Sequence, residues 1–478
     1  MLRRTKIIAT LGPESDDIET LQEMINAGMD VARLNFSHGT AEDHERRATA
    51  LRAAADLCGK AIGIMGDLQG PKIRIRRFAN HSVALTDSQK FFLDSALGLN
   101  DGNQEGVGVA LDTIHEDVKT GDILLLNDGL ITLEVDSIDG TRIHTTVVHG
   151  GILSDHKGIN LKGGGLSAAA LTDIDKENIK LAAKMNLDFL AVSFVRHGED
   201  VEEARRLLVE AGSHALIVAK VERAEAVENI NSIIEATDVV MVARGDLGVE
   251  MGYAELTGIQ KKLIRETRKA HKIVITATQM MESMIQHPIP TRAEVSDVSN
   301  AVMDGTDALM LSGETAIGAY PVDAVREMSE IAIGAEKYPL PVSRTSHRMD
   351  DHFSLVDEAI AMATMYMANH MSVKAIIALT ESGSTTRWMS RIRSDMPIYA
   401  FTPYVETSRR VAMYRGVYPV SFSADIESPR TLYQDIFDTL LANKLATVGD
   451  LAILTKGDLD GISGSTNSMT VIQIKPSS

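Results

Sequence analysis

The sequence predicts an α/β protein built on a (β/α)8 TIM barrel, with an inserted β-rich domain and a further α/β domain at the carboxyl end. Eight short, almost wholly apolar segments alternate with segments of helical periodicity. Strands that are buried on both faces have this apolar composition. The alternation is interrupted after Gly70-Pro71 and again near Pro339, which divides the 478 residues into about three domains.

The bulk composition limits the class of protein. With 44% hydrophobic and 24% charged residues, the chain can form large cores. A formal charge of −18 argues against a nucleic-acid partner and requires local cations for any anionic substrate. A single cysteine, Cys58, rules out a disulfide framework and indicates a cytoplasmic setting. We expect neither a signal peptide nor a membrane partner, because no apolar run approaches ~20 residues.

The barrel is expected over residues 1–70 and 164–336. The predicted strands are Lys6–Leu11, Asp30–Phe36, Ala61–Leu68, Phe189–Val195, Ala215–Val221, Val239–Ala243, Ile273–Thr278 and Ala308–Leu311. The predicted helices between them are Asp16–Asn26, Glu42–Leu57, Thr172–Lys184, Asp200–Ala211, Ala224–Ala236, Tyr253–Ala270 and Arg292–Asp304. Three strands before the interruption and five after it make the eight of the barrel.

Two further domains follow from the breaks in this pattern. Residues 71–163 lack long helical periodicity and carry short β-rich pieces such as Asp122–Leu126 and Leu130–Val135, which predicts an inserted β lid. A linker is expected at Lys337–Asp351, before an α/β domain at 351–478. Its predicted strands are Ala375–Thr380, Ile398–Thr402, Leu451–Thr455 and Met469–Ile474.

The stretch Val239–Glu250 is the centre of the functional hypothesis. An apolar strand ends there in Arg244-Gly245-Asp246, where Gly245 is expected to allow a sharp turn and a close backbone approach. The preceding strand ends in Lys220 and Glu222. A lysine with carboxylates on consecutive strand ends suits a magnesium site that holds a phosphorylated anion. The alternative is an ordinary turn with an Arg–Asp pair.

The other strand ends are also polar, and in such a barrel they meet at one face. The candidates are Arg33, Asn35, Ser37, Asp67, Arg74, Lys220, Glu222, Gly245, Asp246, Thr278, Ser312 and Glu314. Taken singly, most have structural alternatives. Arg33 and Asp67 could form a structural pair, Asn35 and Ser37 could form turns, and His38 could order its loop. Their number at one face favours a functional site.

Seven ordered motifs resemble the pyruvate kinase family over essentially the whole chain. They are TKIIATLGP, ARLNFSHG, GDLQGPKIR, AKVERAEA, VARGDLGVE, ATQMMESM and LSGETAIGAYP. The resemblance implies phosphoryl transfer from phosphoenolpyruvate to ADP, giving pyruvate and ATP. It also implies a mobile lid, a regulatory carboxyl-terminal domain and a homotetramer.

The resemblance gives each candidate a role. Glu222 and Asp246 would hold Mg²⁺, and Gly245 would allow backbone approach to the substrate carboxylate. Arg33 would bind the phosphoryl group and Lys220 would stabilise its charge. Thr278 would lie near the enolate carbon for its protonation, and Arg74 and Lys157 would face the nucleotide. The chain has no GxxxxGK[ST] motif, so nucleotide binding is not of the Walker type.

One departure from the family concerns the monovalent cation. Many members need K⁺, held by residues matching Asn35, Ser37, Asp67 and a threonine where this chain has Leu68. Those members have glutamate where this chain has Lys72. The expectation is that the Lys72 ammonium replaces K⁺, which is possible as a ligand but not required. The alternative is that Lys72 points to solvent.

The carboxyl-terminal domain contains a candidate effector segment. Thr380, Ser382, Gly383, Ser384 and Thr385 follow a predicted strand and precede a helical stretch, and the loop Gly461–Asn467 has similar chemistry. Hydroxyls and free N–H groups at a helix start can bind the phosphate of a metabolite, such as a phosphorylated sugar or a nucleotide monophosphate. Helix capping and a flexible turn are the alternative.

Two rival functions remain at this point. A barrel lyase or aldolase could use the same lysine and carboxylates around Mg²⁺, but it needs no nucleotide lid. A sensor that only binds sugar phosphate needs no complete set of strand-end residues.

Overall fold

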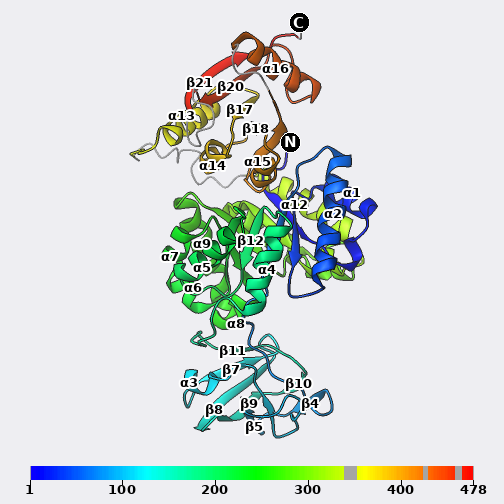
Figure 1. The fold of residues 1–478 in the computed structure, drawn as a ribbon, viewed down its shortest axis with the longest axis vertical. Coiled ribbons are helices and arrows are strands. Elements are labelled where there is room, and N and C mark those ends of the chain that lie inside the picture. Colours follow the sequence, from blue (N-terminus) through cyan, green and yellow to red (C-terminus); the bar gives the residue numbers. More distant parts are fainter. Residues whose placement is uncertain (1, 339–351, 424–428, 458–465, 477–478) are drawn as a thin grey trace.

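The computed structural model describes residues 2–338, 352–423, 429–457 and 466–476. Figure 1 shows three bodies arranged along the longest axis. The β-rich part lies at one end, the barrel in the middle and the carboxyl-terminal α/β part at the other end. The predicted linker falls largely on residues 339–351, which lie outside the described residues.

The central body is a closed barrel of parallel strands in the order β1-β16-β15-β14-β13-β12-β3-β2. All eight predicted barrel strands are confirmed. They are β1 (Lys6–Thr10), β2 (Val31–Asn35), β3 (Gly63–Asp67), β12 (Phe189–Val192), β13 (Leu216–Val221), β14 (Val239–Ala243), β15 (Ile273–Ala277) and β16 (Ala308–Leu311). Nearly all of their residues are buried, because side chains alternate between the barrel interior and the helical layer.

Helices surround the barrel, and each predicted helix is present. They are α1 (Ile18–Ala27), α2 (Ala41–Cys58), α4 (Asp173–Lys184), α5 (Gly198–Glu210), α6 (Ala224–Glu228), α7 (Ile230–Ala236), α9 (Tyr253–Lys269) and α10 (Arg292–Asp304). The predicted helix Ala224–Ala236 is divided at Asn229 into α6 and α7. Short elements η1 (Pro13–Ser15), η2 (Glu282–Ile285) and α11 (Gly313–Ala316) lie in loops, and α12 (Pro321–Glu336) follows the last strand.

The prediction of a sharp turn at Gly245 is wrong. Arg244–Met251 forms the helix α8 directly after β14, and Gly245 lies in its first turn without a positive φ. The sequence RGDLGVE does not indicate a helix, because it contains two glycines and glycine has a low helix propensity. Asp246 is therefore presented from the first turn of a helix.

Four aspartates share a structural role at the opposite, amino ends of the strands. Each directly precedes a strand and accepts a hydrogen bond from a backbone N–H of the neighbouring strand. The pairs are Asp30 with Ile7 (2.8 Å), Asp188 with Ile64 (2.9 Å), Asp238 with Ile217 (2.9 Å) and Asp307 with Val274 (2.9 Å). These bonds satisfy backbone N–H groups near the strand ends that have no carbonyl partner in the sheet. They also fix the register of neighbouring strands.

The inserted segment is mostly β, as predicted. A six-stranded sheet has the order β11-β7-β8-β9-β5-β6, and β10 pairs separately with β4. The strands are β4 (Ser82–Leu85), β5 (Lys90–Asp94), β6 (Gly106–Gly108), β7 (Ile123–Leu126), β8 (Ile131–Asp139), β9 (Arg142–His149), β10 (Gly151–Ser154) and β11 (Ile159–Leu161). The one-turn helix α3 (Ile114–Asp117) packs with them.

The carboxyl-terminal part holds a five-stranded sheet in the order β19-β18-β17-β20-β21. Its strands are β17 (Ala375–Leu379), β18 (Ile398–Thr402), β19 (Val417–Ser421), β20 (Leu451–Gly457) and β21 (Thr466–Gln473). Four were predicted, whereas β19 was missed. Its helices are α13 (Val356–His370), α14 (Ser384–Ser390), α15 (Val405–Val411) and α16 (Pro429–Ala442).

The barrel interior and the carboxyl-terminal domain share a core. Interior residues such as Ile8 and Met241 belong to one buried cluster with Met365 of α13 and Ile376 of β17. The carboxyl-terminal domain therefore covers the amino ends of the barrel strands, and the carboxyl ends face the β-rich lid (Figure 1). In the described ranges, no helix is both long and apolar enough to cross a membrane.

Candidate active site

Arg33, Asp67 and Lys220 form an ion-pair chain at the carboxyl ends of the strands. Arg33 Nε lies 2.6 Å from Asp67 Oδ2, and Lys220 Nζ lies 3.2 Å from Asp67 Oδ1. Burial disfavours the charged form of Asp67, but Lys220 and Arg33 outweigh it and hold its pKa below the ordinary value. Asp67 is therefore an anion that fixes two cations at the mouth of the barrel.

Glu222 adds a second carboxylate to this chain. Its Oε1 lies 3.0 Å from Lys220 Nζ, and its Oε2 accepts a hydrogen bond from the Phe194 backbone N–H at 2.8 Å. Burial raises the pKa of Glu222 in spite of Lys220, and Asp246 and Asp67 raise it further by repulsion. Glu222 thus lies among carboxylates with less positive charge than it needs, so a cation at this position would be stabilised.

Lys220 is oriented by a hydroxyl as well as by carboxylates. It donates to Ser193 Oγ at 2.7 Å, and Ser193 Oγ in turn donates to the Leu68 carbonyl at 2.8 Å. Burial lowers the pKa of Lys220, but Asp67 and Glu222 outweigh it, so the net shift is upward. The ammonium is therefore retained in a site that is almost closed to solvent.

Asp246 is paired with Lys72 rather than with the Lys220 chain. Lys72 Nζ lies 2.9 Å from Asp246 Oδ1 and 3.7 Å from Asp128 Oδ1 in the turn after β7. Burial lowers the pKa of Lys72, yet Asp246 and Asp128 raise it above the ordinary value. Lys72 therefore does not simply point to solvent, and it links the barrel site to the lid.

Thr278 and Gln279 lie after β15 in left-handed backbone conformations, with φ of 69° and 50°. A β-branched residue with positive φ is strained, by about 1–3 kcal/mol. The Thr278 hydroxyl donates to the Ala277 carbonyl at 2.6 Å and accepts from the Gly245 N–H at 2.8 Å. The strained turn therefore holds Thr278 beside the start of α8.

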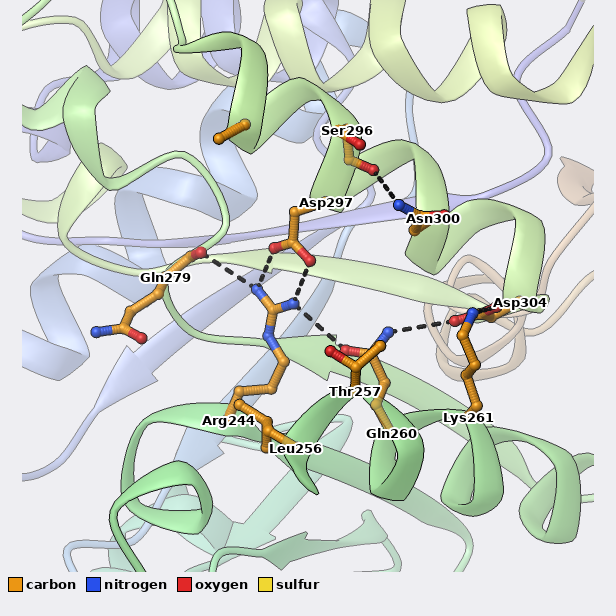
Figure 2. Close-up of a pocket in the computed structure, with 11 residues that line it drawn as sticks. Arg244, Leu256, Thr257, Gln260, Lys261, Gln279, Ser296, Asp297, Asn300 and Asp304 are labelled. Carbon is orange, nitrogen blue, oxygen red and sulfur yellow. Dashed lines mark hydrogen bonds and ion pairs between the residues drawn. The ribbon is translucent and has the colours of Figure 1, made fainter. Parts of the chain in front are cut away.

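Arg244 holds this turn in place (Figure 2). Its guanidinium donates to the Thr278 carbonyl at 2.8 Å and to the Gln279 carbonyl at 3.2 Å. The same group lies 2.7 Å from Asp297 of α10 and 3.3 Å from Gln260 of α9. Arg244, Gln260, Gln279 and Asp297 line a hollow of about 370 Å³ on the α9–α10 face. Arg244 connects that face to the Thr278 turn.

The carboxylates fit a magnesium ion that is completed by other ligands. Within the described residues, no group of three or more histidine, cysteine, aspartate or glutamate side chains is arranged to bind a metal. Mg²⁺ in phosphoryl-transfer sites is typically held by one or two carboxylates, with waters and substrate oxygens. Glu222 and Asp246 could provide two hard oxygen ligands, and burial together with repulsion from Asp246 and Asp67 raises the pKa of Glu222, so a cation there would be stabilised.

Several other candidates have the structural contacts that were considered as alternatives. Asn35 Oδ1 accepts from the Ser37 N–H at 3.2 Å and so stabilises a turn. Glu314 accepts from the Ser312 and Met281 N–H groups at 2.7 and 3.1 Å. These bonds explain those residue types without a ligand.

The two predicted nucleotide-facing residues lie close together at the base of the lid. Arg74 forms an antiparallel bridge with Gly158, and the Lys157 carbonyl accepts from the Ile75 N–H at 2.9 Å. Arg74 also donates to the His156 carbonyl at 3.0 Å. The segments that enter and leave the lid thus bring Arg74 and Lys157 close together.

The candidate effector segment makes capping bonds of its own. Gly383, with φ of 82°, precedes α14, and Thr380 Oγ1 accepts from its N–H at 2.9 Å. Ser384 donates to Asp357 at 3.1 Å, and Thr385 Oγ1 lies 2.6 Å from Thr466 Oγ1. Residues 461–465 of the second candidate loop, Gly461–Asn467, lie outside the described residues.

Sequence reasoning missed two residues of the site, Ser193 and Arg244. Ser193 follows the apolar run Phe189–Val192 in the way that Glu222 directly follows its strand, so the strand-end rule could have found it. Arg244 was considered only as half of a possible Arg–Asp pair. Its partner Asp297 lies on a helix 53 positions later, which no local pattern reveals.

Comparison with known proteins identifies the family. The family model "Pyruvate kinase, barrel domain" matches residues 2–325, and "Pyruvate kinase, alpha/beta domain" matches residues 358–472. Pyruvate kinase II of Salmonella typhimurium is 51% identical over 479 residues, covering 99% of each chain. The pyruvate kinase of Haemophilus influenzae is 51% identical over 461 residues, covering 95% of this chain and 96% of its own. That of Mycobacterium tuberculosis is 38% identical over 474 residues, covering 99% of each chain. The chain belongs to the pyruvate kinase family of phosphotransferases.

Proposed function

We propose that the chain transfers a phosphoryl group from phosphoenolpyruvate to ADP with Mg²⁺, giving pyruvate and ATP. The observation that carries the proposal is the set of contacts around Lys220. A buried ammonium lies 3.0 Å from Glu222 and 3.2 Å from Asp67, which also pairs with Arg33. Phosphoryl transfer depends on positioning and on neutralising charge, and this site offers both.

In the proposed reaction, Arg33 and Lys220 contact the phosphoryl oxygens, and Asp67 keeps both cations in position. Glu222 and Asp246 would hold Mg²⁺, which would supply positive charge for the substrate carboxylate and the enolate oxygen. The Gly245 backbone borders the carboxylate subsite. Thr278 orients the water that protonates the enolate carbon, since its hydroxyl is held beside α8.

Arg74 and Lys157 are proposed to contact the nucleotide phosphates. Their support is that both lie at the base of the lid, adjacent to Lys72, which contacts Asp246. A lid that carries nucleotide contacts distinguishes a kinase from a barrel lyase. A coupled assay with phosphoenolpyruvate and ADP tests the proposal. Activity that requires ADP supports it, whereas turnover without a nucleotide or no turnover refutes it.

We also propose that the enzyme works without K⁺, although the ion remains possible as a ligand of Asn35, Ser37 and Asp67. The Lys72 ammonium lies 2.9 Å from Asp246, and Leu68 is buried in the core with no side-chain oxygen. A unit charge a few ångströms from the phosphoryl group contributes ~1–4 kcal/mol at effective dielectrics of about 80 to 20.

The K⁺ proposal is tested in buffer with tetramethylammonium as the counter-ion. Wild type is expected to be fully active there, whereas Lys72→Glu loses activity and regains part of it when KCl is added. The proposal is contradicted if the activity of the wild-type enzyme falls more than roughly tenfold without K⁺, which corresponds to about 1.4 kcal/mol in the activation free energy.

Regulation by a phosphorylated metabolite at Thr380, Ser382, Gly383, Ser384 and Thr385 is a further part of the proposal. Its support is the 2.6 Å contact of Thr385 with Thr466, which joins two hydroxyl-rich segments at the start of α14. The Asp357 carboxylate accepts a hydrogen bond from Ser384 and would repel an anion there. Helix capping is therefore the alternative that the test must distinguish from effector binding. Sugar phosphates and nucleotide monophosphates are titrated against the phosphoenolpyruvate half-saturation concentration. A response that Ser384→Asp abolishes supports the site, and one that it leaves unchanged contradicts it.

The remaining parts of the proposal concern organisation. We propose a cytoplasmic homotetramer whose barrel comprises residues 1–70 and 164–336, with a lid at 71–163 and a regulatory domain at 351–478. The supports are the closed barrel with separate β-rich sheets and the single cysteine. Light scattering coupled to size exclusion tests the assembly, and a mass other than four chains refutes the tetramer.

A further inference from the structure

A cavity of about 620 Å³ lies between the base of the barrel and the carboxyl-terminal domain, away from the proposed active site. The barrel contributes the carboxyl-terminal ends of α9, α10 and α12. The other domain contributes the end of α13 and the segment 390–398. The volume is within the range of small-molecule sites, about 300–1,000 Å³.

The lining is rich in arginine. Its arginines and carboxylates are Arg4, Arg268, Arg393, Arg415, Glu336 and Asp395. The two carboxylates are engaged by only two of the four arginines. Arg4 pairs with Glu336 and Asp395, and Arg415 pairs with Glu336. The cavity wall therefore carries more positive than negative charge.

Arg268 and Arg393 are the arginines without a carboxylate partner in the described part of the chain. Arg268 donates to the carbonyls of Gly305 and Arg391 at 2.9 and 3.0 Å. Arg393 is exposed, and among the described residues its side chain donates only to the Met303 carbonyl, at 3.3 Å. Among the described residues, no carboxylate forms an ion pair with either guanidinium group, and Asp307 only partly offsets the charge of Arg268.

These two guanidinium groups converge on one place. A Cβ atom built on Gly305 would lie 3.4 Å from Arg268 Nε and 3.4 Å from Arg393 Nη2. Burial lowers the pKa of Arg268 to about 9, and repulsion from Arg391, Arg415 and Arg393 adds to it. Two adjacent guanidinium groups without an anion repel each other, and a phosphate between them can accept hydrogen bonds from both.

Much of the rest of the wall is apolar and contains several methionines, beside the polar residues Asn369, His370, Ser372, Ser390 and Ser394. The apolar residues include Val302, Met303, Met365, Met371, Val373, Ile392 and Met396. Methionine side chains adapt to varied apolar shapes, and their sulfur atoms make favourable contacts with aromatic rings. A ligand that matches this wall has an anionic end and an apolar or aromatic body.

We propose that the cavity binds a small organic phosphate monoester. Arg268 and Arg393 hold its phosphate, and its body lies against the methionine-lined wall. The ligand contacts both domains and so ties the carboxyl-terminal domain to the barrel base. The site is separate from the Thr380–Thr385 segment, because the cavity meets the carboxyl-terminal end of α14, at Ser390, whereas that segment ends in the first turn of the helix.

The test measures the binding of phenyl phosphate and inorganic phosphate to the full-length protein by isothermal titration calorimetry. The variants are Arg393→Gln, which loses a single long hydrogen bond and so tests the site with the fold intact, and Arg268→Gln. Arg265→Gln is the matched control, because Arg265 lies one turn earlier on α9, is exposed and pairs with Glu266.

We expect phenyl phosphate to bind wild type and Arg265→Gln equally and to bind Arg393→Gln and Arg268→Gln about tenfold or more weakly, the scale of one lost charged hydrogen bond. Inorganic phosphate is expected to bind more weakly than phenyl phosphate, because it leaves the apolar wall empty. Equal binding to all four proteins, or no binding to wild type, overturns the proposal. Equal affinity for the two probes overturns the assignment of the apolar wall.

Discussion

The contact between Arg244 and Asp297 is predicted to hold the Thr278 turn in its strained conformation. The substitution Asp297→Asn keeps the shape of the side chain and removes its charge. Arg244 is 8% exposed, so the charge that Asp297 leaves behind stays largely out of water. The guanidinium is then expected to shift from the Thr278 and Gln279 carbonyls, which it now binds at 2.8 and 3.2 Å.

The size of the effect follows from two opposing considerations. Left-handed backbone at Thr278 costs about 1–3 kcal/mol, which the surrounding contacts must offset. A hydrogen bond to a charged group contributes about 1.5–3 kcal/mol. Asp297 is 38% exposed, so water screens part of that contribution. A net loss of about 1.4 kcal/mol in the competent turn corresponds to a tenfold loss of kcat/KM.

The assay is pyruvate formation coupled to lactate dehydrogenase, with thermal unfolding as the check on folding. The matched control is Asp304→Asn, because Asp304 binds Lys261 and Gln260 on the same α9–α10 face but does not contact the Thr278 turn (Figure 2). Asp304→Asn is expected to stay within about twofold of wild type. A normal kcat/KM in Asp297→Asn refutes the reasoning, and so does an equal loss in both variants.

Two further predictions concern carboxylates. Glu222→Gln and Asp246→Asn should each lose at least ~10²-fold in kcat with the fold intact, and near-full activity at ordinary Mg²⁺ would contradict their role as ligands. Glu250 is buried at the junction of lid and barrel, where it accepts hydrogen bonds from Asn160 at 3.2 Å and from the Ala224 N–H at 3.0 Å. Burial raises its pKa to about 7, so its protonated form is favoured in the fold and stability is lost as pH rises from about 4.5 through 7. Across that pH window, the unfolding temperature of wild type should fall relative to that of Glu250→Gln. Parallel curves of unfolding temperature against pH would contradict the raised pKa of Glu250.

The barrel was predictable because its signals are local. An apolar run such as Val239–Ala243 is buried on both faces, and its period and length identify a strand without any partner. The strand-end rule also placed Lys220 and Glu222 at one face, where they lie 3.0 Å apart. Both inferences require only the chain order and the chemistry of the side chains.

The features that the sequence did not predict depend on tertiary contacts, or they contain residues whose local preferences oppose the structure that forms. The α8 helix forms through a sequence with two glycines because β14 delivers it directly onto α9 and the lid strand β11. Strand β19 contains Pro419, and a proline weakens the local signal for a strand because it cannot donate a backbone hydrogen bond. It pairs only with β18 and forms the edge of its sheet, where a proline is tolerated.

The same residue type serves different purposes at the two ends of the barrel, and the partner decides which. At the amino ends, Asp307 accepts from the Val274 N–H and pairs with Arg391, so both its oxygens are satisfied within the fold. At the carboxyl ends, burial raises the pKa of Glu222 despite a lysine at 3.0 Å, and repulsion from Asp246 adds to the shift. A carboxylate whose charge the fold satisfies stabilises structure, whereas one left short of positive charge favours a cation. By the same reasoning, two guanidinium groups without carboxylates at the barrel base favour an anion. Unbalanced charge, rather than charge alone, therefore separates the candidate binding sites from the ion pairs that hold the strands together.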